Sequence, residues 1–316
     1  MDAEIAFRPL DPAKFRDPVV TAQGERRASV ALKTLSTLWF NTGTLCNITC
    51  QSCYIESSPR NDRLAYLTAT EVAGFLDEIA ALRLGTAEIG FTGGEPFMNP
   101  EIIAMIEDAL GRGFRVLVLT NAMKPMMRRR QALLDLRARF GDRLTLRVSI
   151  DHYTQALHET ERGPRSWAPM LAGFKFLIDN GFAVHVAGRL CWGEPEQVAR
   201  GGYATLFGAL GASIDAADPR ALVLFPEMDA RVDVPEITTA CWGILKKSPD
   251  SVMCASSRMV VKRRGAPRPA VLSCTLLPYD DAFEMGDTLA EAAGAVPLNH
   301  PHCAKFCVLG GASCSA

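Results

Sequence analysis

Hydrophobic and polar residues along the chain follow two alternating spacings. Short runs that are apolar along their whole length are typical of buried strands, whereas apolar residues spaced three and four apart predict helices with one inward face. The predicted strands cover Thr37–Phe40, Ala87–Thr92, Phe114–Thr120, Leu144–Ile150, Phe182–Leu190 and Ala221–Phe225. The predicted helices cover 68–85, 99–113, Met126–Phe140, Trp167–Asn180 and Pro195–Leu210.

Local signals mark the ends of these helices. Thr68-Ala69-Thr70-Glu71 is a capping box at a helix start, and Gly85 is expected to close that helix. Strands and helices that alternate in this way predict a parallel sheet covered by helices. Six such units form a partial (β/α)6 barrel rather than the full eight-unit barrel.

The chain divides into three expected parts. Residues 1–35 form an N-terminal extension, residues 36–235 carry the barrel, and residues 236–316 form a small Cys-rich unit with no further alternation. A length of 316 residues and 34.3 kDa suits one catalytic domain with a small appendage.

Composition excludes two classes of partner. A net charge of -1 leaves no basic footprint for nucleic acid, and no apolar stretch reaches the ~18 residues that a membrane span needs. The acidic start Met1-Asp2-Ala3-Glu4 does not resemble a secretory signal, so we expect a cytoplasmic protein with reduced thiols.

Three cysteines, Cys46, Cys50 and Cys53, stand close together directly after the first predicted strand. Three thiolates on one loop can hold three irons of a four-iron, four-sulfur (4Fe-4S) cluster and leave the fourth iron open to another ligand. The alternatives are part of a zinc site, or cysteines that are simply buried as small apolar residues.

A second motif follows about forty residues later, at the end of the next strand. Gly93-Gly94-Glu95-Pro96 comes directly after the apolar run, where two glycines let the backbone approach a ligand closely. The C-x3-C-x2-C run followed by Tyr54, together with this segment, resembles the signatures of the radical S-adenosylmethionine (radical SAM) family. The resemblance implies that the open iron binds S-adenosylmethionine, with Gly93, Gly94 and Glu95 beside its methionine moiety.

Further site residues are expected where the later strands end, because parallel α/β barrels carry their chemistry at the carboxyl ends of the strands. Ser149 and Asp151 resemble family residues that contact the ribose and carboxylate of the cofactor. Arg189 could form an ion pair with the methionine carboxylate. Asn121 is a fourth candidate. Capped turns for Asn121 and Asp151, and a solvated rim charge for Arg189, are the alternatives.

Cys191 follows the fifth strand and belongs to no cluster pattern. A thiol at that end of the barrel could give a hydrogen atom to a substrate radical, as in radical SAM epimerases. The alternative is a small buried residue packed against Trp192.

The C-terminal part holds six of the ten cysteines: Cys241, Cys254, Cys274, Cys303, Cys307 and Cys314. Cys254 and Cys274 flank a predicted β-hairpin, and Cys303 and Cys307 form a closing pair. This pattern resembles the SPASM/twitch extension, which implies a second, auxiliary 4Fe-4S cluster on Cys254, Cys274, Cys303 and Cys307, with Cys314 as a substitute. Structural zinc is the alternative, and the expected reducing location argues against disulfides.

The resemblance as a whole implies an enzyme that cleaves S-adenosylmethionine to a 5'-deoxyadenosyl radical and takes hydrogen from a substrate, with flavodoxin or ferredoxin as electron donor. About 35 residues precede the first strand, which favours a small-molecule substrate over a peptide, since peptide-modifying relatives carry a leader-binding module there. A peptide-modifying maturase and an iron-sulfur electron-transfer protein are the alternatives.

Overall fold

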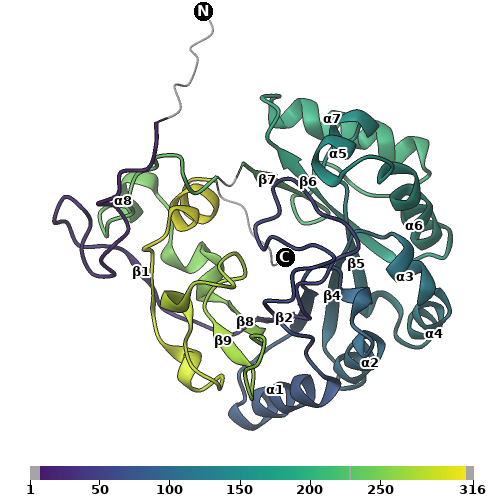
Figure 1. Cartoon of the computed structure of the whole chain (residues 1–316), viewed down its shortest axis with the longest axis horizontal. Coiled ribbons are helices and arrows are strands. Elements are labelled where there is room, and N and C mark those ends of the chain that lie inside the picture. Colours follow the sequence, from purple (N-terminus) through teal and green to yellow (C-terminus); the bar gives the residue numbers. More distant parts are fainter. Residues whose placement is uncertain (1–7, 228, 311–316) are drawn as a thin grey trace, which may run out of the picture.

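The computed structural model describes residues 8–227 and 229–310, and its core is one curved eight-stranded sheet (Figure 1). The strands run in the order β7-β6-β5-β4-β3-β2-β8-β9. They are β2 Thr37–Asn41, β3 Glu88–Thr92, β4 Arg115–Thr120, β5 Leu144–Ser149, β6 Ala183–Leu190, β7 Leu222–Pro226, β8 Ser257–Val261 and β9 Ala270–Leu272. Strands β2 to β7 pair in parallel with their neighbours, which confirms the predicted parallel α/β architecture.

Helices cover the outer side of this sheet (Figure 1). They are α1 Ala69–Leu82, α2 Ile102–Gly111, α3 Lys124–Arg128, α4 Arg130–Phe140, α5 Gln155–Arg162, α6 Trp167–Asp179 and α7 Glu196–Ala209. The Thr68 capping box forms as predicted, but the helix ends at Arg83, which takes the left-handed conformation expected of Gly85. The single helix predicted over Met126–Phe140 is wrong, because the chain breaks at Arg129 into α3 and α4.

Helix α5 was not predicted. Its eight residues are mostly polar, and His158 and Glu161 are its buried side chains, so it has no apolar stripe to detect. Thr154 before it and Gly163 after it, the latter at φ 92°, are the start and stop signals that the sequence did offer.

The C-terminal part continues the barrel sheet. Strand β8 pairs in parallel with β2, and β9 pairs antiparallel with β8, so the predicted hairpin forms and also extends the sheet. Strand β1 Ser29–Val30 pairs with β10 Val296–Pro297, which joins the segment before the barrel to the C-terminal part. Helix α8 Cys241–Leu245 and a π-helix over Cys303–Leu309 complete this part. Single 3-10 turns lie at Pro96–Met98, Gly141–Arg143, Pro249–Ser251, Met253–Ala255, Asp281–Phe283 and Glu291–Ala293.

Two apolar clusters stabilise the two sides of the sheet. One joins the covering helices to residues such as Leu38 and Val118, and the other joins Trp39 and Leu117 to the C-terminal part through Met259 and Phe306. Successive residues of a strand point to opposite faces, so the C-terminal part packs on the inner face of the barrel. Within residues 8–227 and 229–310, no helix is long and apolar enough to cross a membrane.

Candidate functional site

The loop with Cys46, Cys50 and Cys53 leaves the carboxyl end of β2 and packs against the Gly93-Gly94 turn. The Gly94 and Glu95 amides donate hydrogen bonds to the Gly43 and Leu45 carbonyls, at 2.8 and 3.1 Å. A Cβ on Gly94 would lie 2.3 Å from the Leu45 carbonyl oxygen. The glycines therefore let the cysteine loop itself approach β3, a reason that adds to the close approach of a ligand predicted from the sequence.

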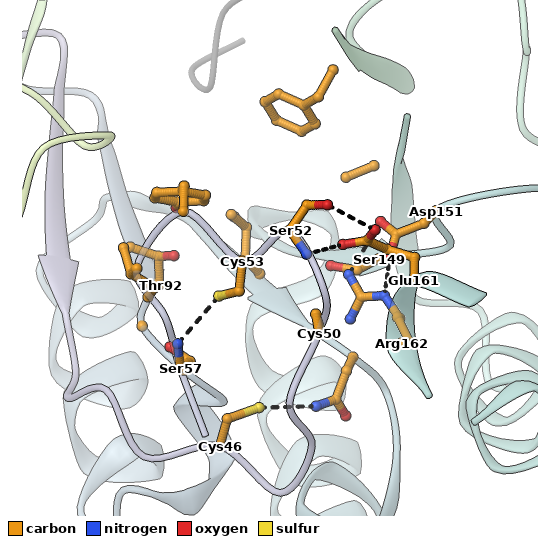
Figure 2. Close-up of a pocket in the computed structure, with 18 of the residues that line it drawn as sticks. Cys46, Cys50, Ser52, Cys53, Ser57, Thr92, Ser149, Asp151, Glu161 and Arg162 are labelled. Carbon is orange, nitrogen blue, oxygen red and sulfur yellow. Dashed lines mark hydrogen bonds and ion pairs between the residues drawn. The ribbon is translucent and has the colours of Figure 1, made fainter. Parts of the chain in front are cut away.

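Cys46, Cys50 and Cys53 all line one cavity of about 170 Å³ at the carboxyl ends of the barrel strands (Figure 2). Ser149, Asp151, Glu161 and Arg162 are grouped beside Cys50 in this cavity (Figure 2). Tyr54, Ile55, Phe225 and Leu276 add apolar surface. A concave site with apolar walls and a few converging polar groups is typical of a cofactor pocket.

Burial strongly affects these thiols. It raises the pKa of Cys46 to about 12 and that of Cys50 to about 11. The nearby Arg162 guanidinium opposes both increases. A thiolate at this site is therefore stabilised by a positive charge already in place, and a bound metal would stabilise it further.

Helix α5 holds the cysteine loop through Glu161. Its carboxylate accepts hydrogen bonds from the Ser52 amide at 2.9 Å and the Ser52 hydroxyl at 3.1 Å, and it pairs with Arg189 Nη1 at 2.7 Å. The Glu161 carbonyl also accepts a bond from the Gln51 amide at 2.8 Å. Four contacts therefore bring the loop between Cys50 and Cys53 against the ends of α5 and β6.

The next residue of α5 supplies the second charged pair. Arg162 Nε lies 2.5 Å from Asp151 Oδ2, and both side chains are largely buried. The charge of Asp151 is the main factor that keeps the pKa of Arg162 above its usual value despite the opposing effect of burial. The site therefore contains two arginines and two carboxylates at the ends of β5, α5 and β6.

The structure brings most of the predicted cofactor residues to this cavity. Gly93, Gly94, Asn121, Ser149, Asp151 and Arg189 all line it. Asp151 pairs with Arg162. Arg189 pairs with Glu161 and is largely buried, so it is not a solvated rim charge. Arg189 Nε is buried and has no hydrogen-bond partner among the described residues, which leaves one guanidinium donor for a ligand.

Glu95 and Asn121 also join the elements beneath the cavity. The Glu95 carboxylate accepts hydrogen bonds from Thr120 Oγ1 at 2.9 Å and the Asn121 amide at 2.8 Å, and burial raises its pKa to about 7. Glu95 is not one of the described residues that line the cavity. The predicted contact of Glu95 with a methionine amino group therefore stays a prediction. Asn121 Oδ1 caps its own turn at Met123, while Nδ2 donates to Asn47 in the cysteine loop at 2.9 Å.

Cys191 lies one residue beyond β6 and is partly buried. It is not one of the described residues that line the cavity. Burial raises the pKa of its thiol to about 11, so the sulfur keeps its proton at neutral pH. The predicted role as hydrogen donor requires an intact S–H bond, and this role stays a prediction.

Comparison with known families identifies the barrel. Residues 40–194 match the sequence model of the radical SAM superfamily. This region belongs to the radical SAM superfamily. The match covers the strands and loops that carry the cysteine triplet, Gly93-Gly94 and both charged pairs. The resemblance seen in the sequence motifs is therefore confirmed.

Two curated proteins share part of this radical SAM region. The antilisterial bacteriocin subtilosin biosynthesis protein AlbA of Bacillus subtilis is 30% identical over 143 residues, which are 45% of this chain and 30% of AlbA. The AdoMet-dependent heme synthase of Methanosarcina barkeri is 30% identical over 135 residues, which are 42% of this chain and 36% of that protein. The matched region thus spans about a third of each relative.

A solved structure shares the fold over a longer region. SuiB of Streptococcus suis bound to S-adenosylmethionine has a TM-score of 0.57 at 11% identity, covering 80% of this chain and 63% of SuiB. SuiB bound to precursor peptide SuiA has a TM-score of 0.59 at 10% identity, covering 84% of this chain and 66% of SuiB. At this identity the likeness establishes the fold alone.

A second cysteine site lies beside the radical SAM barrel. Cys254, Cys274, Cys303 and Cys307 all line one small cavity of about 20 Å³, together with His302 and Leu276. They come from the turn before β8, the end of β9 and the π-helix Cys303–Leu309. Leu276 lines both this cavity and the larger one, so the two sites are neighbours.

The remaining cysteines of this part do not join the group. Cys241 lies on α8, where its sulfur contacts the Thr238 amide at 3.4 Å, and it is absent from the described lining of the small cavity. Cys314 lies outside the described residues. Among residues 8–227 and 229–310, no three His, Cys, Asp or Glu side chains are grouped so as to hold a metal ion. At both sites the cysteines line a cavity.

Sequence reasoning missed two residues of the larger site, Glu161 and Arg162. Both lie at the end of α5, the helix that was not predicted. The stop signal Gly163 could have placed a helix end there, and with it two charged side chains near the ends of β5 and β6.

Proposed function

We propose that this protein is an enzyme that binds a 4Fe-4S cluster on Cys46, Cys50 and Cys53 and cleaves S-adenosylmethionine reductively. The observation that supports this most is that three cysteines line one cavity of about 170 Å³ with charged groups beside them. Three thiolates leave one iron of such a cluster without a protein ligand. When bound, the cluster supplies the electron that breaks the sulfonium of S-adenosylmethionine and yields a 5'-deoxyadenosyl radical.

The chain's own residues fit both parts of this cofactor. Arg189 Nε offers a buried donor to a carboxylate, and Arg162 adds a second positive charge that Asp151 holds in place. Ser149 and Asp151 line the cavity as acceptors for ribose hydroxyls. Glu161 orients the cysteine loop and Arg189 together, since it bonds to both. These residues bind and orient, while the apolar walls exclude water.

The test is an anaerobic assay of the reconstituted, dithionite-reduced protein with S-adenosylmethionine. The wild type should form 5'-deoxyadenosine, and the variant with Cys46, Cys50 and Cys53 all replaced by Ala should form none. Cys241→Ala is the matched control, because it removes a thiol outside both cavities. Equal cleavage by the triple variant would contradict the proposal. Iron uptake without any cleavage by the wild type would favour an electron-transfer protein instead.

We further propose that Cys254, Cys274, Cys303 and Cys307 hold an auxiliary 4Fe-4S cluster in a SPASM/twitch-like unit over 236–316. The four thiols line one cavity, as a fully ligated cluster requires. Four cysteines also suit structural zinc. Elemental analysis distinguishes a cluster from zinc at this site. The wild type should bind about eight irons if both sites hold clusters, and about four irons and one zinc if the C-terminal site holds zinc.

The substrate is proposed by class. The small molecule expected from the sequence fits the heme synthase relative by its name. A peptide is supported by AlbA, named for bacteriocin biosynthesis, and by the SuiB structure with a precursor peptide. To distinguish a small-molecule substrate from a peptide substrate, a host lysate is dialysed. The dialysable fraction and the retained fraction are then each added to the reduced enzyme. The fraction that holds the substrate should raise 5'-deoxyadenosine formation above the rate without substrate. We expect flavodoxin or ferredoxin to replace dithionite as reductant.

A further inference from the structure

A buried arginine stands behind the four-cysteine site. Arg258 on β8 is only 1% exposed, and its guanidinium donates hydrogen bonds to backbone carbonyls alone. The acceptors are Cys254 at 2.6 Å, Ser257 at 2.8 Å, Ala292 at 2.8 Å and Gly294 at 3.1 Å. These carbonyls satisfy the donors of the guanidinium but carry no net charge.

No carboxylate within residues 8–227 and 229–310 forms an ion pair with Arg258. Two other buried arginines are paired, Arg27 with Glu236 and Arg162 with Asp151, each at 2.5 Å. At 1% exposure the charged guanidinium of Arg258 loses its hydration, and no described carboxylate replaces it. A buried charge is normally paired with an opposite charge. Arg258 lacks the carboxylate partner that Arg27 and Arg162 have.

The candidate anion beside Arg258 is the Cys254 thiolate. Four covalent bonds separate the Cys254 carbonyl oxygen from its sulfur, so Arg258 Nη1 lies within roughly 9 Å of that sulfur. Metal binding requires all four thiols as thiolates. Four thiolates around Zn²⁺, or around an oxidised 4Fe-4S core of charge +2, leave a net charge of about −2.

We propose that Arg258 is the counter-charge of a metal site on Cys254, Cys274, Cys303 and Cys307. This inference rests on the proposed metal site in the C-terminal part, but holds for either metal. Arg258 is a positioning residue that acts on the thiolates through its charge. Its charge stabilises the anionic, metal-loaded site, and for a cluster it favours reduction, which adds one more negative charge.

The test compares Arg258→Met with Arg258→Lys in the full chain. Both variants lose the planar guanidinium that bonds to four carbonyls. Only Arg258→Lys keeps the positive charge. If the site holds a cluster, the reduction equilibrium of that cluster should shift at least about tenfold against reduction in Arg258→Met, which is 59 mV for one electron. The potential of Arg258→Lys should stay within half of that shift. The triple variant without Cys46, Cys50 and Cys53 provides the background, since it leaves a single cluster to titrate.

If elemental analysis finds zinc instead, the proposal of an auxiliary cluster is wrong. The role of Arg258 can then still be measured at the zinc site. Zinc release to a chelator should then be at least about tenfold faster from Arg258→Met than from Arg258→Lys. Equal potentials or equal release rates in the two variants would overturn the charge role and leave a structural one. If Arg258→Met does not fold, Arg258→Gln removes the same charge and keeps two donors, so the same comparison applies.

Discussion

The two cysteine sites lie side by side but are built in opposite ways. In the barrel, three thiols sit within eight residues of one loop and face a cavity of about 170 Å³. In the C-terminal part, four thiols come from three separate segments and line a cavity of about 20 Å³. A site with three ligands and free space is suited to bind a substrate, whereas a site with four ligands and little space is suited to hold a metal permanently.

The residues around the two cavities also differ, in their charge and polarity. Two carboxylates and two arginines hold the barrel site, and one arginine Nε has no described partner. The C-terminal site is surrounded by apolar residues such as Val252 and Phe283. Of two buried arginines near it, Arg258 bonds to backbone and Arg27 is paired with Glu236. The first arrangement provides groups for a polar ligand, and the second excludes one.

Loss of a ligand from the closed site should have the largest effect. Cys303 is buried at the start of the π-helix, and its replacement by Ser removes one of the four proposed ligands. Iron content should fall from about eight to about four per chain, and soluble yield should drop, because a metal-held segment loses folding energy with its ligand. Cleavage of S-adenosylmethionine by the protein that remains soluble should persist.

Cys241→Ser is the matched control for that variant. It lies in the same part of the chain but outside the small cavity, so iron content should stay at the wild-type value. If Cys303→Ser keeps about eight irons, Cys303 is not a ligand and the two sites do not differ as described.

Glu161→Gln should have an intermediate effect, confined to the open site. The substitution removes the charge that Arg189 pairs with and weakens the two bonds to Ser52. Because such charged hydrogen bonds contribute about 1.5–3 kcal/mol each, we expect about a tenfold or greater loss of S-adenosylmethionine cleavage with both metals retained. The measurement is 5'-deoxyadenosine formation alongside metal analysis.

Glu78→Gln serves as the control for this change. Glu78 on α1 also accepts two hydrogen bonds from a distant backbone segment, at Leu289 and Ala290, but does not line either cavity. Its cleavage rate should stay close to that of the wild type. Equal loss in both variants would mean that Glu161 acts through general stability alone.

Cys191→Ala should have the smallest effect on the cofactor reaction. The described lining of both cavities lacks this residue, so cleavage of S-adenosylmethionine should change by no more than about twofold. With the true substrate in deuterated buffer, a hydrogen-donor role predicts lost product with 5'-deoxyadenosine still formed. Deuterium in the wild-type product would support that role, and full product from Cys191→Ala would rule it out.

The parallel barrel and both cysteine groups could be predicted because their signals are local. Strands that are apolar along their length, and Gly93-Gly94 directly after one of them, need no knowledge of distant contacts. The pairing of β8 with β2 could not be predicted, because it joins segments about 220 residues apart through backbone hydrogen bonds that no side chain specifies.

The charged pairs of the open site were missed for a related reason. Helix α5 is short and polar, and only the fold brings Glu161 to Ser52 and Arg162 to Asp151. Arg189 was predicted as a ligand contact from its place after a strand, and the structure adds the carboxylate that holds it. The sequence therefore predicted where the site lies, while its internal electrostatics depended on tertiary contacts.

The central claim is that the triplet site is open to S-adenosylmethionine and the C-terminal site is closed. Paramagnetic resonance of the reduced protein, recorded with and without S-adenosylmethionine, tests it most directly. In the wild type, the cofactor should change one part of the spectrum and leave the rest unaltered. In the variant without Cys46, Cys50 and Cys53, the remaining signal should not respond. A response of that remaining signal, or no response in the iron-loaded wild type, would contradict the account.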